Sequence, residues 1–575
     1  MSKVRKCMQQ VPDITAIALD LMRQALGCAP HLLRCGIVLV AVAGSTGCDS
    51  KSGGKELSHS SGTLSDKSTP SRILRRGLSG EPRTLDPQLA DDTFSLQVVR
   101  DLYEGLTAED RYGRIVPGAA SSWTVDASGT IYTFQLRPDA KWSDGARTIA
   151  SEFVAGIRRA VDPKTASGSA DLLAVIKGAN DILAGRKKVT ALGVTEIGES
   201  SVRIELEHPA PFVLQILSQP VAAPVHLGSP SASGVAQLPS KLNVSNGAYT
   251  LVSRVPGASI ELMRNKYYWD VQHVPTERVR YIDVESEATE LKEYIAGQLD
   301  MTFTIPMSDL SRVSQKYGAE LQTAPILGIL YLALDVSEPP LSNSRDLRQA
   351  LSMALDRDSI SEHVMMGVTP AYTFVARGTS AYTPPVYEWA KWPRERQLSY
   401  ARYLYARSGY SAKNPLRLKL YFNSEEIVQR IMVAVAGSWK QNLGVDADLE
   451  SDEFRVFLTG RKDRRRWDVL RMGWYADYDD PASFLEVFAQ DNSQNDPGYS
   501  SAQFNSLIDA ARIEPQPDKR INLLEKSEEV LLNDYPIIPV YFYEGRRLVK
   551  PYLGGAEITP LNRTYSKHLF WKNAS

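Results

Sequence analysis

All four cysteines of this chain of 575 residues lie within its first 48 residues, namely Cys7, Cys28, Cys35 and Cys48. The sequence after Cys48 therefore cannot form a disulfide or a thiolate metal site. A chain of this length is too long for one compact core, and we expect about three or four domain-sized units. The hydrophobic content of 43% is ordinary for a soluble globular protein, and the net charge of −1 gives no electrostatic sign of nucleic-acid binding.

The N-terminal segment 1–47 is typical of a targeting signal. Arg23 and Arg34 precede an apolar run over 36–43, which is too short to span a bilayer as a helix but suits a signal peptide. Small residues and Cys48 follow, and the segment resembles a bacterial lipoprotein signal in which cleavage frees Cys48 for lipidation. Ser45 stands where that motif usually carries leucine. The alternative is an ordinary cleaved signal with an incidental cysteine.

Residues 49–70 are rich in Ser, Gly, Lys and Asp and lack apolar periodicity, as flexible tethers do. With Cys48 they give a lipidated cysteine and linker over 48–72. We therefore expect a body outside the cytoplasm, in the periplasm or cell envelope, that touches a membrane only through its lipid anchor.

The body alternates strand and helix patterns, which predicts a mixed α/β architecture. Residues 131–136 and 202–207 alternate apolar with mostly polar positions, as half-buried strands do. The run 325–334 is better explained as a buried strand than as a membrane segment, because it is only ten residues long. Residues 425–443 predict an amphipathic helix that is capped by Ser424 and stopped by Gly444.

Catalytic signatures are missing from the sequence. No histidine pair has the HExxH spacing of a zinc peptidase, and there is no G-x-S-x-G elbow, Walker loop or G-x-G-x-x-G. The acidic run at 477–480 lacks the ladder of a calcium loop. We predict no catalytic residue, no metal site and no cofactor; a secreted hydrolase with a triad assembled from distant residues stays open as an alternative.

The segment 471–481 carries two opposite charges close together, just after a strand-like run and just before Pro481. Asp477 could accept hydrogen bonds from an ammonium group, and Arg471 could clamp a carboxylate. An unblocked peptide has both of these ends. The alternative is an aspartate-rich turn whose charges are merely solvated.

A basic cluster lies just before this segment. We expect Arg464, Arg465 and Arg466 to form a solvated loop. Arg461 lies only ten residues before Arg471 and could reach the same pocket.

Four further stretches carry a family resemblance, at 81–87, 134–145, 246–251 and 547–551. With 471–481 they make the chain similar to the oligopeptide-binding proteins of bacterial ABC importers, the extracytoplasmic solute-binding proteins of family 5. The first three stretches are shared across this peptide and nickel class, whereas 471–481 is more specific to its peptide branch.

The resemblance implies an α/β, three-domain, bilobal periplasmic-binding-protein fold of class II, cluster C, with a hinge between two lobes that close on the ligand. It places domain I at 73–93 with 219–327 and 545–575, domain II at 94–218 and domain III at 328–544.

The resemblance also assigns roles to individual residues, with the peptide lying extended and pairing its main chain with strand edges. Asp477 would hold the peptide ammonium and Arg471 the carboxylate, Gly473 and Tyr475 would make main-chain contacts, and Trp474 would form a pocket wall. The remaining pocket-lining positions are Arg461, Phe454 in place of a tryptophan, Leu458, Asn423, Tyr331 and Glu81.

Several positions depart from the family pattern. Gly328 and Tyr475 stand where the best-known relatives join the halves of the large lobe by a disulfide. Gln219 and Val428 replace two histidines, and Ala333 replaces an acidic pocket residue. These departures bear on peptide length and side-chain preference more than on recognition of the peptide amine.

The sequence thus predicts a monomeric, membrane-tethered receptor that captures short peptides and delivers them to an ABC permease without chemistry of its own. One rival hypothesis keeps the fold and changes the cargo to a murein peptide, a nickel chelate, haem or an oligosaccharide. Asp477 argues against a cargo that lacks an amine, and the shortage of clustered His and Cys argues against direct metal ligation.

Overall fold

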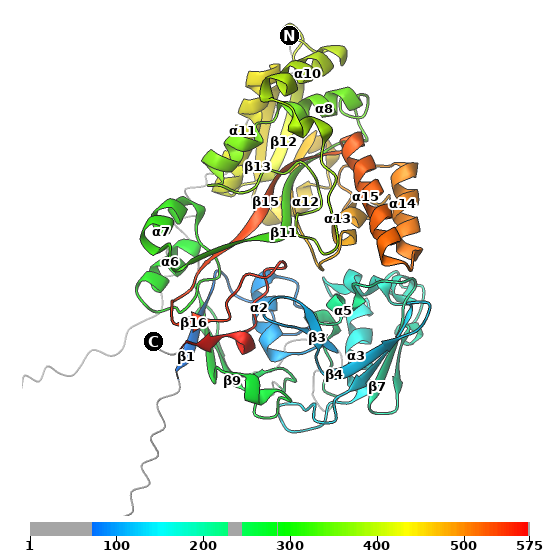
Figure 1. Cartoon of the computed structure of the whole chain (residues 1–575), viewed down its shortest axis with the longest axis vertical. Helices are drawn as coiled ribbons and strands as arrows, with labels where there is room; N and C mark the ends of the chain where they lie inside the picture. Colours follow the sequence, from blue (N-terminus) through cyan, green and yellow to red (C-terminus); the bar gives the residue numbers. More distant parts are fainter. Residues whose placement is uncertain (1–71, 228–243, 285, 491, 573–575) are drawn as a thin grey trace, which may run out of the picture. The chain divides into compact units, whose positions relative to one another are not determined.

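A five-stranded mixed sheet contains the segment that the sequence singles out (Figure 1). The computed structural model describes residues 72–227, 244–284, 286–490 and 492–572, all within one compact unit of residues 68–575. The predicted signal, Cys48 and the linker to residue 71 lie outside the described residues. The strand order is β13 (Asp446–Asp452), β12 (Arg417–Asn423), β14 (Val469–Tyr475), β11 (Leu321–Leu334) and β15 (Ile537–Leu548).

Strand β11 lies between two antiparallel neighbours in this sheet. It pairs with β14 on one side and β15 on the other, and β12 runs parallel to both β13 and β14. Residues 326–334 of β11 are all buried, which confirms the predicted buried strand.

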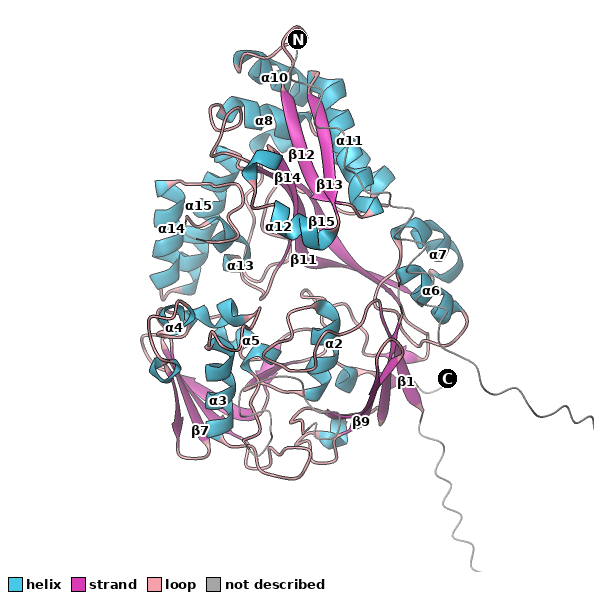
Figure 2. Cartoon of the chain, turned by 180° about the vertical axis from the view of Figure 1, so that it is seen from behind, coloured by secondary structure: helices cyan, strands magenta, loops and turns pink. Residues whose placement is uncertain are grey.

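Each face of the five-stranded sheet carries its own apolar core. On one face pack α8 (Arg345–Ala354), α10 (Arg394–Arg407) and α11 (Glu426–Leu443). On the other pack α13 (Ala482–Leu485), α14 (Ala502–Ile513) and α15 (Pro517–Asp534), the last two side by side in Figures 1 and 2. Helices on both faces explain why the strands are apolar at successive positions.

The predicted helix at 425–443 is confirmed as α11, but its predicted cap is wrong. Gly444 ends the helix in the left-handed conformation with φ of 79°, as the sequence suggested. The N-cap residue is Glu425, with no side-chain capping bond. Ser424 instead continues the strand pairing, because its N–H donates to the carbonyl of Asp452 at 2.8 Å.

A second sheet has the order β1 (Ile73–Leu78), β10 (Arg278–Asp283), β9 (Ser259–Arg264) and β8 (Tyr249–Val255). Its core includes α2 (Thr93–Leu102) and the C-terminal strands β16 (Leu553–Gly554) and β17 (Phe570–Trp571). Beside it, α6 (Glu287–Ile295) and α7 (Leu310–Tyr317) share a small cluster with the end of β15.

A third sheet has the order β4 (Ala120–Val125), β5 (Ile131–Leu136), β7 (Ser201–Glu205) and β6 (Val194–Ile197). Strand β5 has the predicted bounds, and β7 covers most of the predicted strand at 202–207. Helices α3 (Ala150–Val161), α4 (Ala179–Leu183) and α5 (Val213–Ile216) complete its core. The small hairpin of β2 (Thr107–Glu109) and β3 (Ile115–Pro117) precedes it. The domain boundaries given above stay a prediction.

Two of the shared sequence stretches hold the fold together through buried polar groups. Asp86 pairs with Arg159 at 2.6 Å, and Glu152 accepts a hydrogen bond from the indole of Trp142 at 2.7 Å. These two stretches therefore have a structural role that does not depend on a ligand. In the described parts of the chain, no helix is both long and apolar enough to cross a membrane.

Candidate ligand-binding site

Strand β14 and the loop that follows it place the two predicted charged groups on one side of the main chain. Alternate residues of a strand point to the same face, so Arg471, Gly473 and Tyr475 share one face and Asp477 continues the alternation. The pairing with β11 extends past the strand end, because the N–H of Ala476 donates to the carbonyl of Leu327 at 2.8 Å.

Arg471 is a cation without a carboxylate partner. Its Nη1 donates to Asn423 Oδ1 at 3.3 Å and its Nη2 to the hydroxyl of Tyr543 at 3.1 Å. No ion pair of Arg471 is formed with the described residues, and both its Nε and the Nδ2 of Asn423 are buried without a partner. Since buried polar groups are normally paired, this corner has donors available for an anionic group.

Asp477 is the complementary anion. Its side chain reaches solvent, yet within the described chain no residue donates a hydrogen bond to its carboxylate oxygens. The surrounding protein displaces water and raises its pKa to about 6, against a smaller opposing effect of Arg563. A carboxylate that is open to solvent but desolvated by its surroundings is expected on the wall of a cleft.

The backbone of Asp477 is held from three directions. Its carbonyl accepts from Gln219 Nε2 at 3.0 Å and from Arg563 Nη2 at 2.6 Å, and its N–H donates to Ser483 Oγ at 2.9 Å. The side-chain amide of Gln215 binds the main chain of Asp479. Its Oε1 accepts from the Asp479 N–H at 2.6 Å, and its Nε2 donates to the Asp479 carbonyl at 3.2 Å. The carboxylate of Asp477 is therefore presented by a fixed main chain.

The side chains of the next three residues of this loop, 478–480, all contact other parts of the protein. Tyr478 stacks on Phe212 with ring centroids 4.2 Å apart. The Asp479 carboxylate accepts from the N–H and hydroxyl of Ser380, at 2.8 and 2.6 Å, and Asp480 forms a two-point ion pair with Arg520 at 2.8 and 2.9 Å. The acidic run is therefore not a uniformly solvated turn, because two of its three carboxylates are partnered.

Gly328 and Tyr475 are direct partners in the β11–β14 ladder. The ring of Tyr475 stacks on Tyr543 at 4.5 Å, and a Cβ added at Gly328 would lie 2.7 Å from a carbon of that ring. Glycine is required here by the close approach of the ring. Aromatic stacking thus occupies the position where the family resemblance implies a disulfide.

Helix α12 (Phe454–Gly460) contributes an apolar surface and ends at Arg461. Phe454 and Leu458 lie one turn apart on it and are 47% and 42% exposed, so they form an open apolar patch. Arg461 donates to Gln494 at 2.8 Å and pairs with Asp496 at 3.3 Å. Unlike Arg471, it has a carboxylate partner among the described residues.

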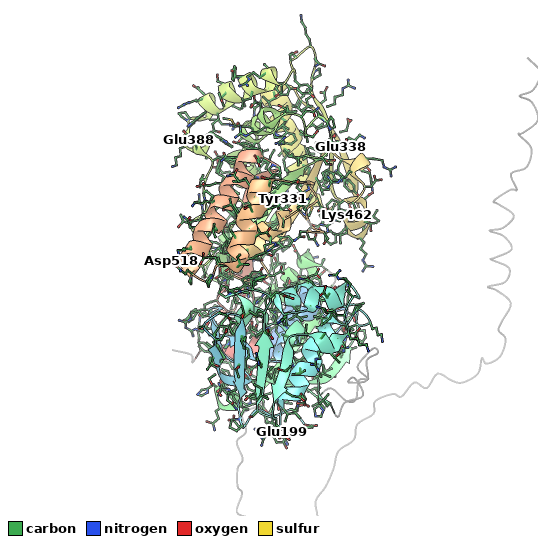
Figure 3. All side chains as sticks on the ribbon, turned by 90° about the vertical axis from the view of Figure 1, so that its right-hand side faces the viewer. Glu199, Tyr331, Glu338, Glu388, Lys462 and Asp518 are labelled. Carbon is green, nitrogen blue, oxygen red and sulfur yellow. The ribbon has the colours of Figure 1, made fainter. Side chains whose placement is uncertain are left out.

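Three further predicted site residues have contacts of their own within the protein. Tyr331 is buried edge-to-face against Phe374 with centroids 5.1 Å apart, in the core that α14 and α15 cover (Figure 3). Trp474 is half-buried and donates from its indole to the Ser483 carbonyl at 2.7 Å. Glu81 lies in the loop after β1 and pairs with Arg254 at 3.2 Å.

The basic cluster at 464–466 differs from the predicted solvated loop. It forms a short 3-10 helix, and each arginine has a carboxylate partner: Arg464 with Asp335, Arg465 with Asp463, and Arg466 with Glu450 and Asp452. Asp335 and the β13 carboxylates of Glu450 and Asp452 are distant in sequence from their partners. Asp463 is only two residues from Arg465, whose side chain stays 89% exposed as the sequence predicted.

Sequence reasoning missed the residues that position the two charges. Tyr543 supports Arg471, and Gln215 and Arg563 hold the loop of Asp477. Helical spacing does not relate Gln215 to Gln219, because α5 ends at Ile216 and Gln219 is extended. No local pattern marked Arg563. Among the described residues no cluster of His, Cys, Asp and Glu could hold a metal ion.

Comparison with known proteins gives the family. Residues 114–496 match the model of the bacterial extracellular solute-binding proteins, family 5. The chain belongs to this family. It is 34% identical over 546 residues to the periplasmic oligopeptide-binding protein OppA of Salmonella typhimurium, covering 94% of this chain and 98% of that protein.

Solved structures agree with this family and with the predicted fold. The Escherichia coli murein tripeptide binding protein MppA superposes with a TM-score of 0.76 at 32% identity, covering 87% of this chain and 99% of that one. Haemophilus influenzae OppA in complex with RPPGFSPFR gives 0.75 at 29% identity, covering 87% and 99%. The predicted α/β, bilobal periplasmic-binding fold is confirmed.

Proposed function

We propose that this protein captures short peptides with free termini and delivers them to the permease of an ABC importer. The observation that carries the proposal is a pair of opposite charges on one face of β14, the carboxylate of Asp477 and the guanidinium of Arg471, neither of which forms an ion pair with the described residues. The relatives named above as binding proteins for oligopeptides and a murein tripeptide support it.

The spacing of the two charges suits a short extended ligand. The six residue steps from Arg471 to Asp477 cover at most about 20 Å of strand, and the length of the Arg471 side chain reduces the gap that a ligand must cover. Peptides of about three to six residues can then place an ammonium on Asp477 and a carboxylate on Arg471. Gly473 and Tyr475 lie between them and offer main-chain groups.

The rest of the proposed site recognises side chains only loosely. Trp474 and the open patch of Phe454 and Leu458 supply apolar walls, and Asn423 supplies an amide nitrogen, Nδ2, that has no hydrogen-bond partner among the described residues. Arg461, Tyr331 and Glu81 complete the proposed set. In this account two lobes close about a hinge, the protein acts as a monomer, and hydrated pockets between the lobes tolerate varied side chains.

The protein binds its cargo without chemistry. Purified protein incubated with a mixed peptide library should retain a subset of the peptides, and these should be recovered intact on denaturation. Recovery of shortened peptides that accumulate with time would contradict the proposal and favour a hydrolase.

Peptide affinity should fall in acid because a proton competes with the ligand ammonium for Asp477. The raised pKa of about 6 means that the carboxylate is mostly ionised at pH 7 and mostly protonated at pH 5. Binding a cation lowers that pKa, so the complex is favoured above pH 6. Calorimetry should show roughly tenfold weaker tripeptide binding at pH 5 than at pH 7. Asp477→Asn should show no such step, and an unchanged wild-type affinity at pH 5 would refute the role of this carboxylate.

We further propose that Cys48 is lipidated and tethers the body to a membrane. The Cys48→Ser variant should then move from the membrane pellet to the soluble fraction when cells are fractionated. A variant that still sediments with membranes as wild type does would show that another anchor is responsible.

A further inference from the structure

Two buried arginines face a small cavity away from the proposed peptide site. Arg76 on β1 is 1% exposed and Arg547 on β15 is 5% exposed. Both line the cavity with the polar residues Gln97, Thr302, Asn562 and Thr564. Met301 forms isolated β-bridges with Arg76 on β1 and with Val549, the residue after β15. Figure 1 shows the end of β15 near β1. The cavity is small, with room for about one water molecule or one monatomic ion.

The charges beside the two arginines do not balance, although the carboxylate of Glu290 lies against the lining residues Gly77 and Phe303. Arg76 has one carboxylate, Asp101, at 3.7 Å, and it donates to Tyr281, Ser566 and the Thr564 carbonyl at 2.7–3.0 Å. Arg547 donates only to neutral groups, Thr564 Oγ1 at 2.5 Å and Asn562 Oδ1. No carboxylate of the described chain lies within ion-pair distance of Arg547, so one buried positive charge has no counter-charge.

Two further features indicate that this pair of arginines lacks a hydrogen-bond acceptor and one counter-charge among the described residues. The Nε atoms of both arginines are buried and have no hydrogen-bond partner. Burial and, to a smaller extent, the neighbouring charge of Arg76 together lower the pKa of Arg547 to about 10. Burying an unpaired cation is costly, and proteins normally supply a counter-charge.

We propose that this cavity binds one small monovalent anion of the size of chloride, held between Arg76 and Arg547. The small room between the arginines suits a monatomic ion, and the uncompensated charge of Arg547 favours an anion over a neutral water. The ion would join β1, β15 and the C-terminal segment at 562–566. It also gives a role to Arg547, the first residue of the shared stretch at 547–551, which contacts none of the proposed peptide-binding residues.

Thermal unfolding in different salts tests the site. At constant ionic strength, replacing gluconate by chloride should raise the folded-to-unfolded ratio tenfold for each tenfold increase in chloride above its dissociation constant. For a protein of this size that is about 1 °C in Tm per tenfold. Bromide should act as chloride does. Equal Tm values in chloride and gluconate would overturn the proposal.

Two variants and one crystal measurement separate a site from a general salt effect. Arg547→Gln removes the charge and should abolish the difference between chloride and gluconate. Arg520→Gln is the matched control, because Arg520 is equally buried but is paired with Asp480, and it should keep that difference. Wild-type crystals grown in sodium bromide should show an anomalous peak between Arg76 and Arg547. Absence of that peak would overturn the proposal even if Arg547→Gln does not fold.

Discussion

Replacing Asp477 by asparagine should weaken the binding of an unblocked tripeptide by roughly two to four decades. In the proposed complex the ammonium and the carboxylate are both removed from water, and deleting one charge leaves the other buried alone. Such a loss costs about 3–5 kcal/mol, at about 1.4 kcal/mol per decade of affinity. An exposed turn aspartate would cost only about 0–1 kcal/mol. Titration calorimetry on the purified variant distinguishes these outcomes.

Acetylation of the peptide amine removes the same contact from the ligand side. Wild-type protein should bind the N-acetylated tripeptide as weakly as Asp477→Asn binds the free one, and acetylation should cost the variant little more. Asp479→Asn is the matched control in the same loop, because its carboxylate is already satisfied by Ser380. It should retain binding within a few fold. Near-wild-type binding by a folded Asp477→Asn would mean that Asp477 does not hold the ligand.

Removing the guanidinium of Arg471 should have an effect that depends on peptide length. Arg471→Ala should weaken tripeptide binding by about 3 kcal/mol or more, which is at least two decades, because the peptide carboxylate would lose its only charged partner. A peptide longer than about six residues carries its carboxylate past this side chain and should lose much less. Calorimetry with peptides of three and eight residues measures the difference.

Three checks accompany this variant. Arg471→Lys keeps the charge but loses the planar fork, and should give an intermediate loss. A C-amidated tripeptide should bind wild type as weakly as the free tripeptide binds Arg471→Ala. Unfolding temperatures must stay close, because Arg471 also contacts Asn423 and Tyr543. Equal losses for short and long peptides would refute a carboxylate contact.

Much of the local structure could be predicted from the sequence because it follows from apolar periodicity. The buried strand β11, the strand β5 and the helix α11 with its Gly444 stop were all visible in this way. The cap of α11 was not, since Ser424 is recruited by the neighbouring strand β13 through Asp452. Pairing between distant strands is invisible to a local pattern.

The site was predictable as a segment but not as a set of contacts. The sequence pointed to 471–481 and to Asp477 within it, but not to the contacts that distinguish this residue from Asp479 and Asp480. Which one is free depends on Ser380 and Arg520, which are distant in the chain and satisfy Asp479 and Asp480. The stacking of Tyr475 on Tyr543 over Gly328 was likewise hidden, because it joins three separate strands.

The central claim is that the natural cargo is a peptide with a free amine, and mass spectrometry of the material that co-purifies with the native protein tests it most directly. Protein purified without denaturation and then unfolded should release a mixture of short peptides, mostly of about three to six residues, with unblocked N-termini. A single non-peptide species, such as a nickel chelate, haem or an oligosaccharide, would contradict the account.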